Sequence, residues 1–507
     1  MNGYSFLSWG FPVCFAGLLL LYRLLPRRCR PVLLFLFSVL LYAAEGWYAL
    51  AFLAGVILSV YAGGRALGAL KDREAASLRA EGLTPDSKKQ IRRQAKRRQS
   101  ALMWAVLALN LAVLAFTKFP ILPRHGQLLM PLGLSFFMFQ ALGYLIDVKL
   151  NKITAEKNLF RFALFVSFFP QLIQGPIGRY KDLTPALFAG ETPTSAQVRA
   201  GLMRLVTGYV KKLVLADRLT AAVALLLADT GSGAAVALGA VLYAFRLLWD
   251  FSGGIDIALG AAGMLGIPMA ENFRAPFLSR SLEEYWTRWH ISMGSWFRDY
   301  IFYPMNMAPG MLRLSGTVRK RFKTGFLTRV PLYLSLLVTW LATGVWHGNS
   351  LNFVLWGLTN GVLLIVGQEL RPLRERLYAA RPAWKQSACR AVLTTLGTFL
   401  LLCLIRLWDC YAGPAEVFSA LNRLFTAFFA APLPALGLTV TDTVLLLAGF
   451  AATLTYDLNL YRNRTLSLAG RSEALYWTAL VLFVLVILLF GKYGIGYNAA
   501  DFIYGKY

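Results

Sequence analysis

Apolar runs of about 20 residues recur along the chain, and each is long enough to cross the hydrocarbon core of a lipid bilayer. Hydrophobic residues make up 57% of the 507 residues and charged residues only 15%, against about 25% charged in a soluble domain. The chain has too few charged side chains to cover its folded surface in water. We therefore predict an all-α polytopic membrane protein. The candidate spans are residues 5–25, 31–45, 46–64, 100–118, 129–147, 158–174, 200–228, 233–250, 330–346, 351–368, 390–408, 439–456 and 474–491.

Basic residues gather between these spans and predict the direction of each one. The chain has 52 Lys and Arg against 25 Asp and Glu, a net charge of +27, and residues 65–98 alone hold eleven Lys and Arg. The positive-inside rule places such a segment in the cytoplasm. Counting spans from there puts the N-terminus outside, and counting from the basic clusters at the other end of the chain puts the tail 491–507 outside as well. The inner basic segments are then 26–30, 149–157, 319–323, 371–390 and 462–471, and the outer segments 119–128 (with His125) and 409–438 are poor in charge.

The basic excess does not indicate a nucleic-acid-binding protein. Residues 88–98 (KKQIRRQAKRR) have no interleaved aromatic residues, so we interpret them as part of a solvated basic loop. Cations near a membrane surface attract anionic headgroups by about 1 kcal/mol each, and we therefore expect membrane lipids as partners.

The first apolar run and the cysteines exclude two further interpretations. Residues 11–25 end in the basic stretch 26–30 rather than at a small-residue cleavage site, so we expect a retained first span rather than a signal peptide. The five cysteines form no C-x-x-C pair, and neither a zinc site nor a redox motif is predicted.

Residues 250–305 break the pattern of apolar spans. Ionisable side chains are too frequent there for a lipid-facing helix, because each central charge costs several kcal/mol. Irregular backbone at membrane depth occurs only where protein surrounds it or where it lines a cavity. We therefore predict short re-entrant helices around a polar chamber, with an interfacial helix and snorkelling arginines as the alternative. The polar residues are Asp250, Asp256, Glu271, Asn272, Arg274, Arg280, Glu283, Glu284, Arg288, His290, Arg298 and Asp299.

Two of the three histidines lie in polar breaks of apolar sequence. His290 lies inside the 250–305 break, and His347 lies between glycines where the run 330–368 must turn. An ionisable residue inside a membrane is a functional candidate, although a structural hydrogen-bonding role stays open for each. A neutral imidazole is a suitable general base, since its ordinary pKa of about 6.5 lies close to working pH.

A single base restricts the chemistry. No Ser/His/Asp arrangement, H-E-x-x-H, G-x-S-x-G or P-loop motif can be recognised in the sequence. A lone imidazole cannot hydrolyse an amide, but it can deprotonate a hydroxyl that attacks an activated acyl thioester. The sequence therefore favours acyl transfer over proteolysis or phosphoryl transfer.

Ordered motifs between about residues 130 and 370 resemble those of the membrane-bound O-acyltransferase (MBOAT) family. Residues 251–260 (FSGGIDIALG) and 264–273 (MLGIPMAENF) resemble the family stretches DFSGYSDMAIG and LPENF. Residues 286–292 (WTRWHIS) with 296–300 (WFRDY) resemble WRRWHISLSxWLRDY, and 344–348 (GVWHG) resembles GLWHG. Further matches are 131–136 (PLGLSF), 169–177 (FPQLIQGPI) and 208–217 (GYVKKLVLAD). The chain is most similar to the bacterial alginate O-acetylation branch, to which the teichoic-acid D-alanyl transferase is related.

The resemblance implies a ring of about 11–13 transmembrane helices, with the re-entrant helices around a central tunnel. It implies N-terminal helices with the basic loop 65–99 in residues 1–128, a catalytic core in 129–370, and C-terminal helices with an outer tail in 371–507. His347 matches the catalytic histidine of the family, and His290 matches its second histidine, on the donor side. The expected tunnel or substrate-binding residues are Asp256, Asn272, Trp286, Arg288, Ser292, Arg298, Asp299, Trp346 and Asn349.

The implied activity moves an acetyl or other small acyl group across the bacterial inner membrane to a cell-envelope polysaccharide or polymer. The donor is a cytosolic thioester, acetyl-CoA or acyl carrier protein, and the basic residues 319–323 are expected to attract it. An extracytoplasmic acyltransferase partner or the acceptor polymer itself completes the transfer. No bound cofactor and no metal are expected.

Two departures from the family pattern leave the acyl group open. Gly254 and Ile255 replace the usual Tyr-Ser before Asp256, and residues 304–310 (PMNMAPG) replace the glycine-rich PLGGNR. D-alanyl transfer to teichoic acid from a carrier protein is therefore an alternative. Two alternatives from other functional classes are a membrane transporter that catalyses no reaction and a lipid scaffold or assembly protein. The scaffold alternative predicts that both membrane histidines are dispensable.

Overall fold

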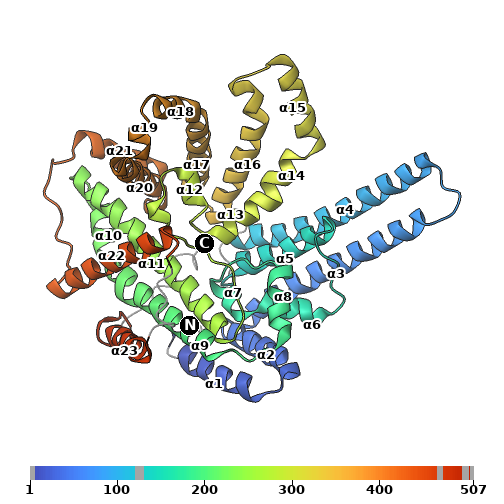
Figure 1. The fold of residues 1–507 in the computed structure, drawn as a ribbon, viewed down its shortest axis with the longest axis horizontal. Helices are drawn as coiled ribbons and strands as arrows, with labels where there is room; N and C mark the ends of the chain where they lie inside the picture. The colour runs from blue at the N-terminus through green and yellow to red at the C-terminus, as the bar shows by residue number, and fades with distance from the viewer. Residues whose placement is uncertain (1–5, 9, 120–130, 465–471, 494–501, 503–507) are drawn as a thin grey trace. The chain divides into compact units, whose positions relative to one another are not determined.

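The computed structural model describes residues 6–8, 10–119, 131–464, 472–493 and 502. His125, residues 120–128, and most of the two chain ends placed outside by the charge pattern lie outside the described residues. The chain forms two compact units (Figure 1). Unit 1 comprises Met1–Leu205 and Ile255–Ala270, and unit 2 comprises Val206–Gly254 and Glu271–Gly505.

Eight described helices are long and apolar enough to cross a membrane, and they coincide with eight of the thirteen predicted spans. The other five predicted spans fall on shorter helices. The all-α polytopic fold is confirmed, while the helical ring around a tunnel stays a prediction. The eight long helices are α3 (Trp47–Leu78), α4 (Pro85–Lys118), α11 (Gly233–Met264), α16 (Val330–His347), α17 (Leu351–Glu369), α20 (Ala388–Cys410), α22 (Val440–Tyr461) and α23 (Glu473–Phe490).

Unit 1 is built around α5 (Leu134–Lys149), which is buried from Leu134 to Val148. A helix that is apolar on every side must be covered on every side, and neighbouring helices of the same unit cover it. Helices α3, α4, α6 (Leu159–Ser167) and α7 (Phe169–Ile173) pack against it, and the rest of unit 1 consists of α1 (Gly10–Leu24), α2 (Arg30–Ala43), α8 (Tyr180–Ala189), most of α9 (Ser195–Tyr209) and the end of α11.

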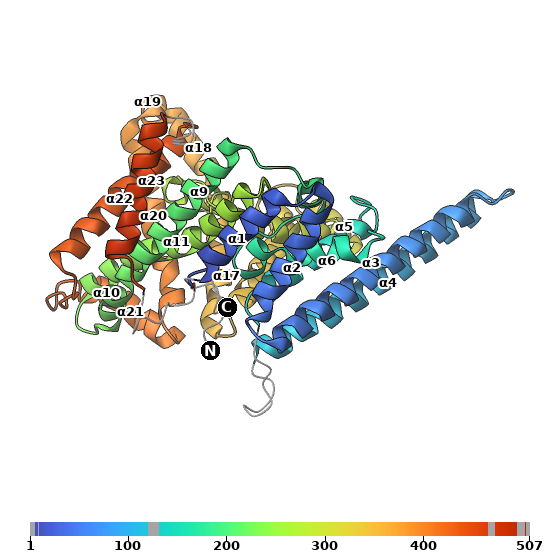
Figure 2. The ribbon, with the colours of Figure 1, turned by 90° about the horizontal axis from the view of Figure 1, so that it is seen from below.

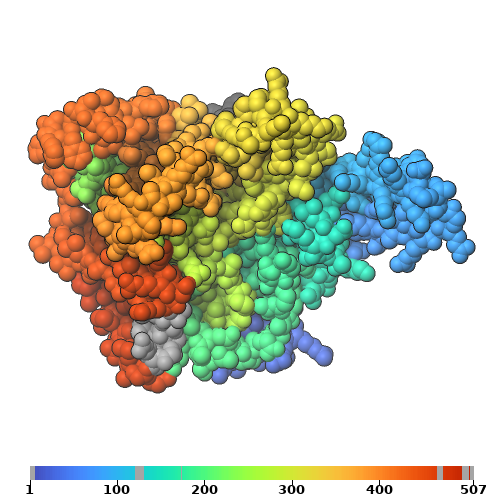
Figure 3. Space-filling view, turned by 45° about the horizontal axis from the view of Figure 1, so that its top comes forward, coloured from blue at the N-terminus to red at the C-terminus, as the bar shows by residue number. Residues whose placement is uncertain are grey.

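The basic segment 65–99 is helical, so its prediction as a loop is wrong. Helices α3 and α4 run antiparallel along it and leave a turn of only residues 79–84 (Figures 1 and 2). Lys, Arg, Gln and Ala are strong helix formers, and Pro85 occupies the first helical position, where its ring is tolerated. Figure 3 shows the outer part of the pair, in blue, as a lobe on the surface. The cations therefore line a rigid helical pair.

Unit 2 holds the remaining spans and a series of short helices. Its first part consists of the π-helical segment η3 (Val210–Ala216), α10 (Asp217–Ala228) and most of α11. After the break come η4 (Pro276–Leu278), α12 (Leu282–Trp286), α13 (Ile291–Phe297), η5 (Arg298–Phe302), α14 (Tyr303–Asn306), α15 (Pro309–Arg321) and η6 (Phe326–Arg329). The rest is α16, α17, α18 (Arg371–Ala380), α19 (Pro382–Gln386), α20, α21 (Pro414–Thr426), α22 and α23.

The break in the apolar pattern begins at residue 265, after α11, and its predicted start at residue 250 is wrong. Helix α11 continues through Gly253 and Gly254 to Met264. The glycine serves close packing there, because a Cβ at Gly253 would lie 2.9 Å from the carbonyl oxygen of Gly208. The helix ends before Gly266, whose φ of 75° lies in the left-handed region that favours glycine. The short helices predicted for the rest of the region are present.

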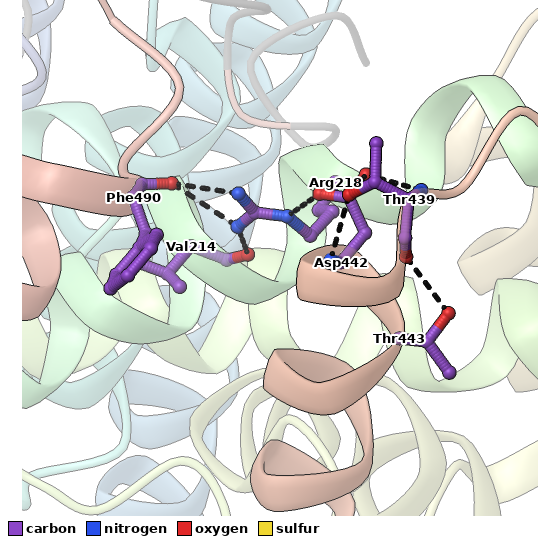
Figure 4. Close-up of polar contacts among 6 residues, drawn as sticks. All are labelled: Val214, Arg218, Thr439, Asp442, Thr443 and Phe490. Atoms are coloured by element: carbon purple, nitrogen blue, oxygen red, sulfur yellow. Dashed lines mark hydrogen bonds and ion pairs between the residues drawn. The ribbon is translucent and has the colours of Figure 1, made fainter.

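Arg218 fastens the last two long helices to the start of unit 2 (Figure 4). Its guanidinium forms an ion pair with Asp442 at the start of α22, and it donates to the carbonyl oxygens of Val214 and Phe490. The bond to Phe490 holds the C-terminal end of α23. One buried cation therefore joins α10, η3, α22 and α23.

Candidate active site

The two candidate histidines of unit 2, His290 and His347, both lie close to Trp346. The His290 ring centroid is 6.1 Å from that of Trp346, and the His347 centroid is 4.8 Å from it. Both histidines are buried, with 0% and 3% of their surface exposed. Residues that are 57 positions apart in the sequence thus form one buried cluster, which holds three of the predicted site residues.

His290 occupies a strained turn that Asn272 holds from the opposite segment. Its φ of 47° is in the left-handed region, which costs a non-glycine residue roughly 1–2 kcal/mol. The backbone N–H of Ile291 donates to the Asn272 carbonyl oxygen at 3.1 Å, and that of Ser292 donates to Asn272 Oδ1 at 2.8 Å. Asn272 therefore caps α13 and fixes the direction of the His290 side chain. Of the predicted site residues, Asn272 accepts with both its carbonyl oxygen and its side-chain Oδ1, and Ser292 donates its backbone N–H.

The surroundings of His290 keep its ring neutral. Phe251 packs edge-on against it at 4.7 Å, and Trp346 lies on another side. Burial lowers the pKa of His290 to about 3, because a low-dielectric environment disfavours the charged form. The imidazole is therefore unprotonated at ordinary pH.

His347 is the last residue of α16, and α17 packs against it. Gly348 and the short turn that follows reverse the chain, as expected from the glycines, and α17 begins at Leu351. The ring of Trp356 on α17 lies 4.7 Å from that of His347 at an angle of 71°. The two helices cross closely at Gly344 and Gly357, where a Cβ on Gly357 would lie 3.2 Å from the Gly344 Cα. This crossing sets the distance between His347 and Trp356.

Trp286 and Arg288 surround the cluster rather than enter it. Trp286 donates from Nε1 to Asn360 Oδ1 at 3.2 Å and packs on Trp356. Arg288 pairs with Glu284 at 2.9 Å. These contacts fix the α12 turn that leads to His290.

Four further predicted site residues, Asp256, Arg298, Asp299 and Asn349, lie outside the buried cluster. Arg298 and Asn349 are exposed, and Arg298 pairs with its neighbour Asp299 at 3.2 Å. Asp256 belongs to unit 1, where it accepts a hydrogen bond from Arg204 at 2.9 Å.

Two buried charge clusters of unit 2 were not among the predicted site residues. Lys212 Nζ lies 2.5 Å from Asp250 and 3.0 Å from Asp217, and all three side chains are at least 95% buried. Arg406 pairs with Asp409 at 2.8 Å inside α20. The sequence contains a signal for both clusters, because ionisable residues inside apolar spans are functional candidates by default. The predicted span 390–408 contained Arg406.

The cluster can supply a neutral base inside a largely aromatic shell. Aromatic walls exclude water, and this strengthens the hydrogen bonds and dipoles that stabilise a developing oxyanion. Among the described residues, no group of three or more His, Cys, Asp or Glu side chains could hold a metal ion. The geometry suits proton transfer by imidazole.

Part of the chain is similar to known membrane acyltransferases. Residues 153–318 match the sequence model described as MBOAT, membrane-bound O-acyltransferase family. The "Probable alginate O-acetylase AlgI" of Azotobacter vinelandii is 36% identical over 270 residues, which are 53% of this chain and 50% of that protein. The peptidoglycan O-acetyltransferase of Helicobacter pylori is 27% identical over 332 residues, 56% and 59% of the two chains. The teichoic acid D-alanyltransferase of Bacillus subtilis is 30% identical over 251 residues, 48% and 60% of the two chains.

These matches cover part of each protein. The chain spans about half the length of the alginate O-acetylases that it matches. The matched residues 153–318 include Asn272, His290 and Ser292, whereas Trp346 and His347 follow them. The protein is a multi-pass membrane protein, and its residues 153–318 are similar to the membrane-bound O-acyltransferase family.

Proposed function

We propose that the protein is a membrane O-acyltransferase that moves an acetyl or other small acyl group from a cytosolic thioester to a hydroxyl of a cell-envelope polysaccharide. The observation that carries the proposal is the buried pair His290 and His347 around Trp346. The names of the relatives agree with it, because they describe O-acetylases, an O-acetyltransferase and D-alanyltransferases.

His347 acts as the general base in this proposal. Its imidazole takes the proton of the acceptor hydroxyl while the hydroxyl oxygen attacks the thioester carbonyl carbon. The carbon–sulfur bond then breaks, and the proton passes from the imidazole to the departing thiolate. One ester and one thiol replace one alcohol and one thioester, so the step balances without an oxidant or a metal.

His290 lies on the donor side of the cluster in this account. Acetyl-CoA or an acyl carrier protein supplies the thioester from the cytosol, and the basic residues 319–323 attract this anionic donor. An extracytoplasmic partner or the polymer itself receives the group on the other side of the membrane. Both assignments rest on the charge pattern of the sequence and on the family resemblance.

The second candidate function is D-alanyl transfer to teichoic acid, which the teichoic acid D-alanyltransferases among the relatives favour. The chemistry at His347 is the same, and only the acyl group and the acceptor differ. An amine on the transferred group distinguishes this candidate from acetyl transfer.

Matched strains with and without the protein test the proposal. Mild base releases ester-linked groups from purified envelope polymers, and mass spectrometry identifies them. Acetate that is lost with the gene and restored by the plasmid-borne protein supports O-acetylation, and alanine in its place supports the second candidate. Equal ester content in both strains would refute the acyltransferase.

A further inference from the structure

We propose that Arg406, ion-paired with Asp409, is a positioning residue that holds His290 in place through Tyr285 and Trp289. The inference rests on the proposed acyl transfer, because it gives a part in that reaction to a buried ion pair outside the histidine cluster.

The ion pair has a location that its own stability does not explain. Arg406 and Asp409 lie inside α20, an apolar helix of 23 residues, with only 5% and 7% of their side chains exposed. Arg406 lies four residues before the end of α20, and burying its charge away from water still costs free energy. A buried ion pair returns little net stability compared with apolar residues of the same volume. Its contacts therefore point to another role.

The guanidinium of Arg406 contacts the segment before His290 in two ways, with one edge and with its planar face. Its Nη2 donates to the Tyr285 hydroxyl at 2.9 Å, and the guanidinium carbon lies 5.0 Å from the centroid of the Trp289 ring. Tyr285 and Trp289 stack on each other at 5.7 Å with an interplanar angle of 21°. A planar guanidinium can make both contacts at once, whereas a lysine ammonium cannot.

These contacts end one residue before the strained turn. Trp289 pairs by its backbone with Phe273, and the two rings lie 5.0 Å apart. His290 follows directly with its left-handed backbone. A strained residue persists only where its surroundings over-determine its conformation. Asn272 holds the turn from the side of α13, and Arg406 holds it from the side of α12.

The test removes the pair while preserving the fold. In the double variant Arg406→Met/Asp409→Leu both charges are replaced by apolar side chains, which is close to neutral for stability. Arg376→Met, at an exposed position on α18, is the matched control for the loss of an arginine. The full-length protein is studied in lipid nanodiscs. Acetyl-CoA is the donor, and base-treated envelope polymer from the host is the acceptor.

The proposal predicts a specific combination of results. The thermal unfolding midpoint of the double variant stays close to that of the wild type, while amide hydrogen exchange in residues 285–292 becomes faster. The kcat for thiol release falls by up to about 100-fold, because a shift of about 1 Å beside the reacting groups disturbs their alignment, and the KM for acetyl-CoA is unchanged. Arg406→Lys keeps the charge and does not restore kcat, and Tyr285→Phe shows a smaller loss.

Two results would overturn the proposal. One is a double variant with wild-type kcat and wild-type exchange at 285–292. The other is a loss of kcat that comes with a collapsed unfolding midpoint, which would mean that the pair only supports the fold. If the wild-type protein itself transfers no acyl group, the proposed function fails, and the exchange measurement still decides whether Arg406 holds the His290 turn.

Discussion

Gly357 lies at the point where α17 crosses α16, and replacing it with alanine should move the two sides of the active site apart. A Cβ there would lie 3.2 Å from the Gly344 Cα and would also overlap the Trp340 carbonyl oxygen. Favourable contacts between carbon atoms are about 3.5–4.0 Å long. The helices must therefore separate by roughly 0.5–1 Å, because neither obstacle is a flexible side chain.

The separation acts directly on the His347 ring. Trp356 precedes Gly357, and His347 follows Gly344 by three residues, so the crossing holds their rings 4.7 Å apart. We expect Gly357→Ala to destabilise the fold by about 1–3 kcal/mol, as other overpacked sites do. We also expect kcat to fall by up to about 100-fold, because the base is displaced from the acceptor hydroxyl.

Gly367→Ala in the same helix is the matched control. No heavy atom among the described residues lies within 4 Å of its Cβ position, and alanine is the better helix former by about 1 kcal/mol. Thermal unfolding in nanodiscs measures stability, and thiol release from acetyl-CoA measures kcat. If Gly357→Ala keeps the wild-type kcat and unfolding midpoint, the crossing does not set the geometry of the base.

Three further predictions concern the same unit. Lys212→Met should cost about 3–5 kcal/mol of stability, because Asp217 and Asp250 would be left buried without their cation. Unfolding by detergent measures this loss, and the control Lys211→Met should lose much less. Equal losses in the two variants would contradict the role of Lys212 as the buried cation. His290 is neutral in the fold with a pKa of about 3, so acid favours the unfolded chain, in which the ring binds a proton below about pH 6.5. Stability should therefore fall by up to about 1.4 kcal/mol per pH unit between that pH and about 3; His290→Gln should reduce the slope, and an unchanged slope would assign it to other groups. Arg218→Met should speed hydrogen exchange at the start of α22 and the end of α23, because its bonds to Asp442 and Phe490 are lost; unchanged exchange there would mean that the helices are held by their apolar contacts.

Hydropathy and the glycine signals predicted much of the fold, because they depend on local chemistry. Apolar runs marked the long helices, and the glycines around His347 marked the turn between α16 and α17. The prediction failed where tertiary contacts outweigh local signals. Gly253 suggested a break, yet in α11 it allows close packing against Gly208. Charge suggested a loop at 65–99, yet Lys and Arg are good helix formers, and α3 and α4 pair along it.

The candidate site could be predicted only in part for the same reason. The motifs singled out His290 and His347, and the structure brings their rings together around Trp346. Their catalytic roles stay predictions. Trp356 lies against His347 from the next helix, α17, and Arg406 lies against Trp289 from the distant helix α20. No local pattern connects them to the histidines, since only the packing of α17 and α20 brings them there.

The transfer itself is tested most directly by His347→Ala in cells that lack the native gene. Envelope polymers are purified, and their ester-linked acyl groups are released by mild base and quantified. The account predicts that acylation falls to the level of the strain without the gene, while membranes contain as much of the variant as of the wild-type protein. Wild-type acylation by the His347→Ala protein would contradict the assignment of His347 as the base.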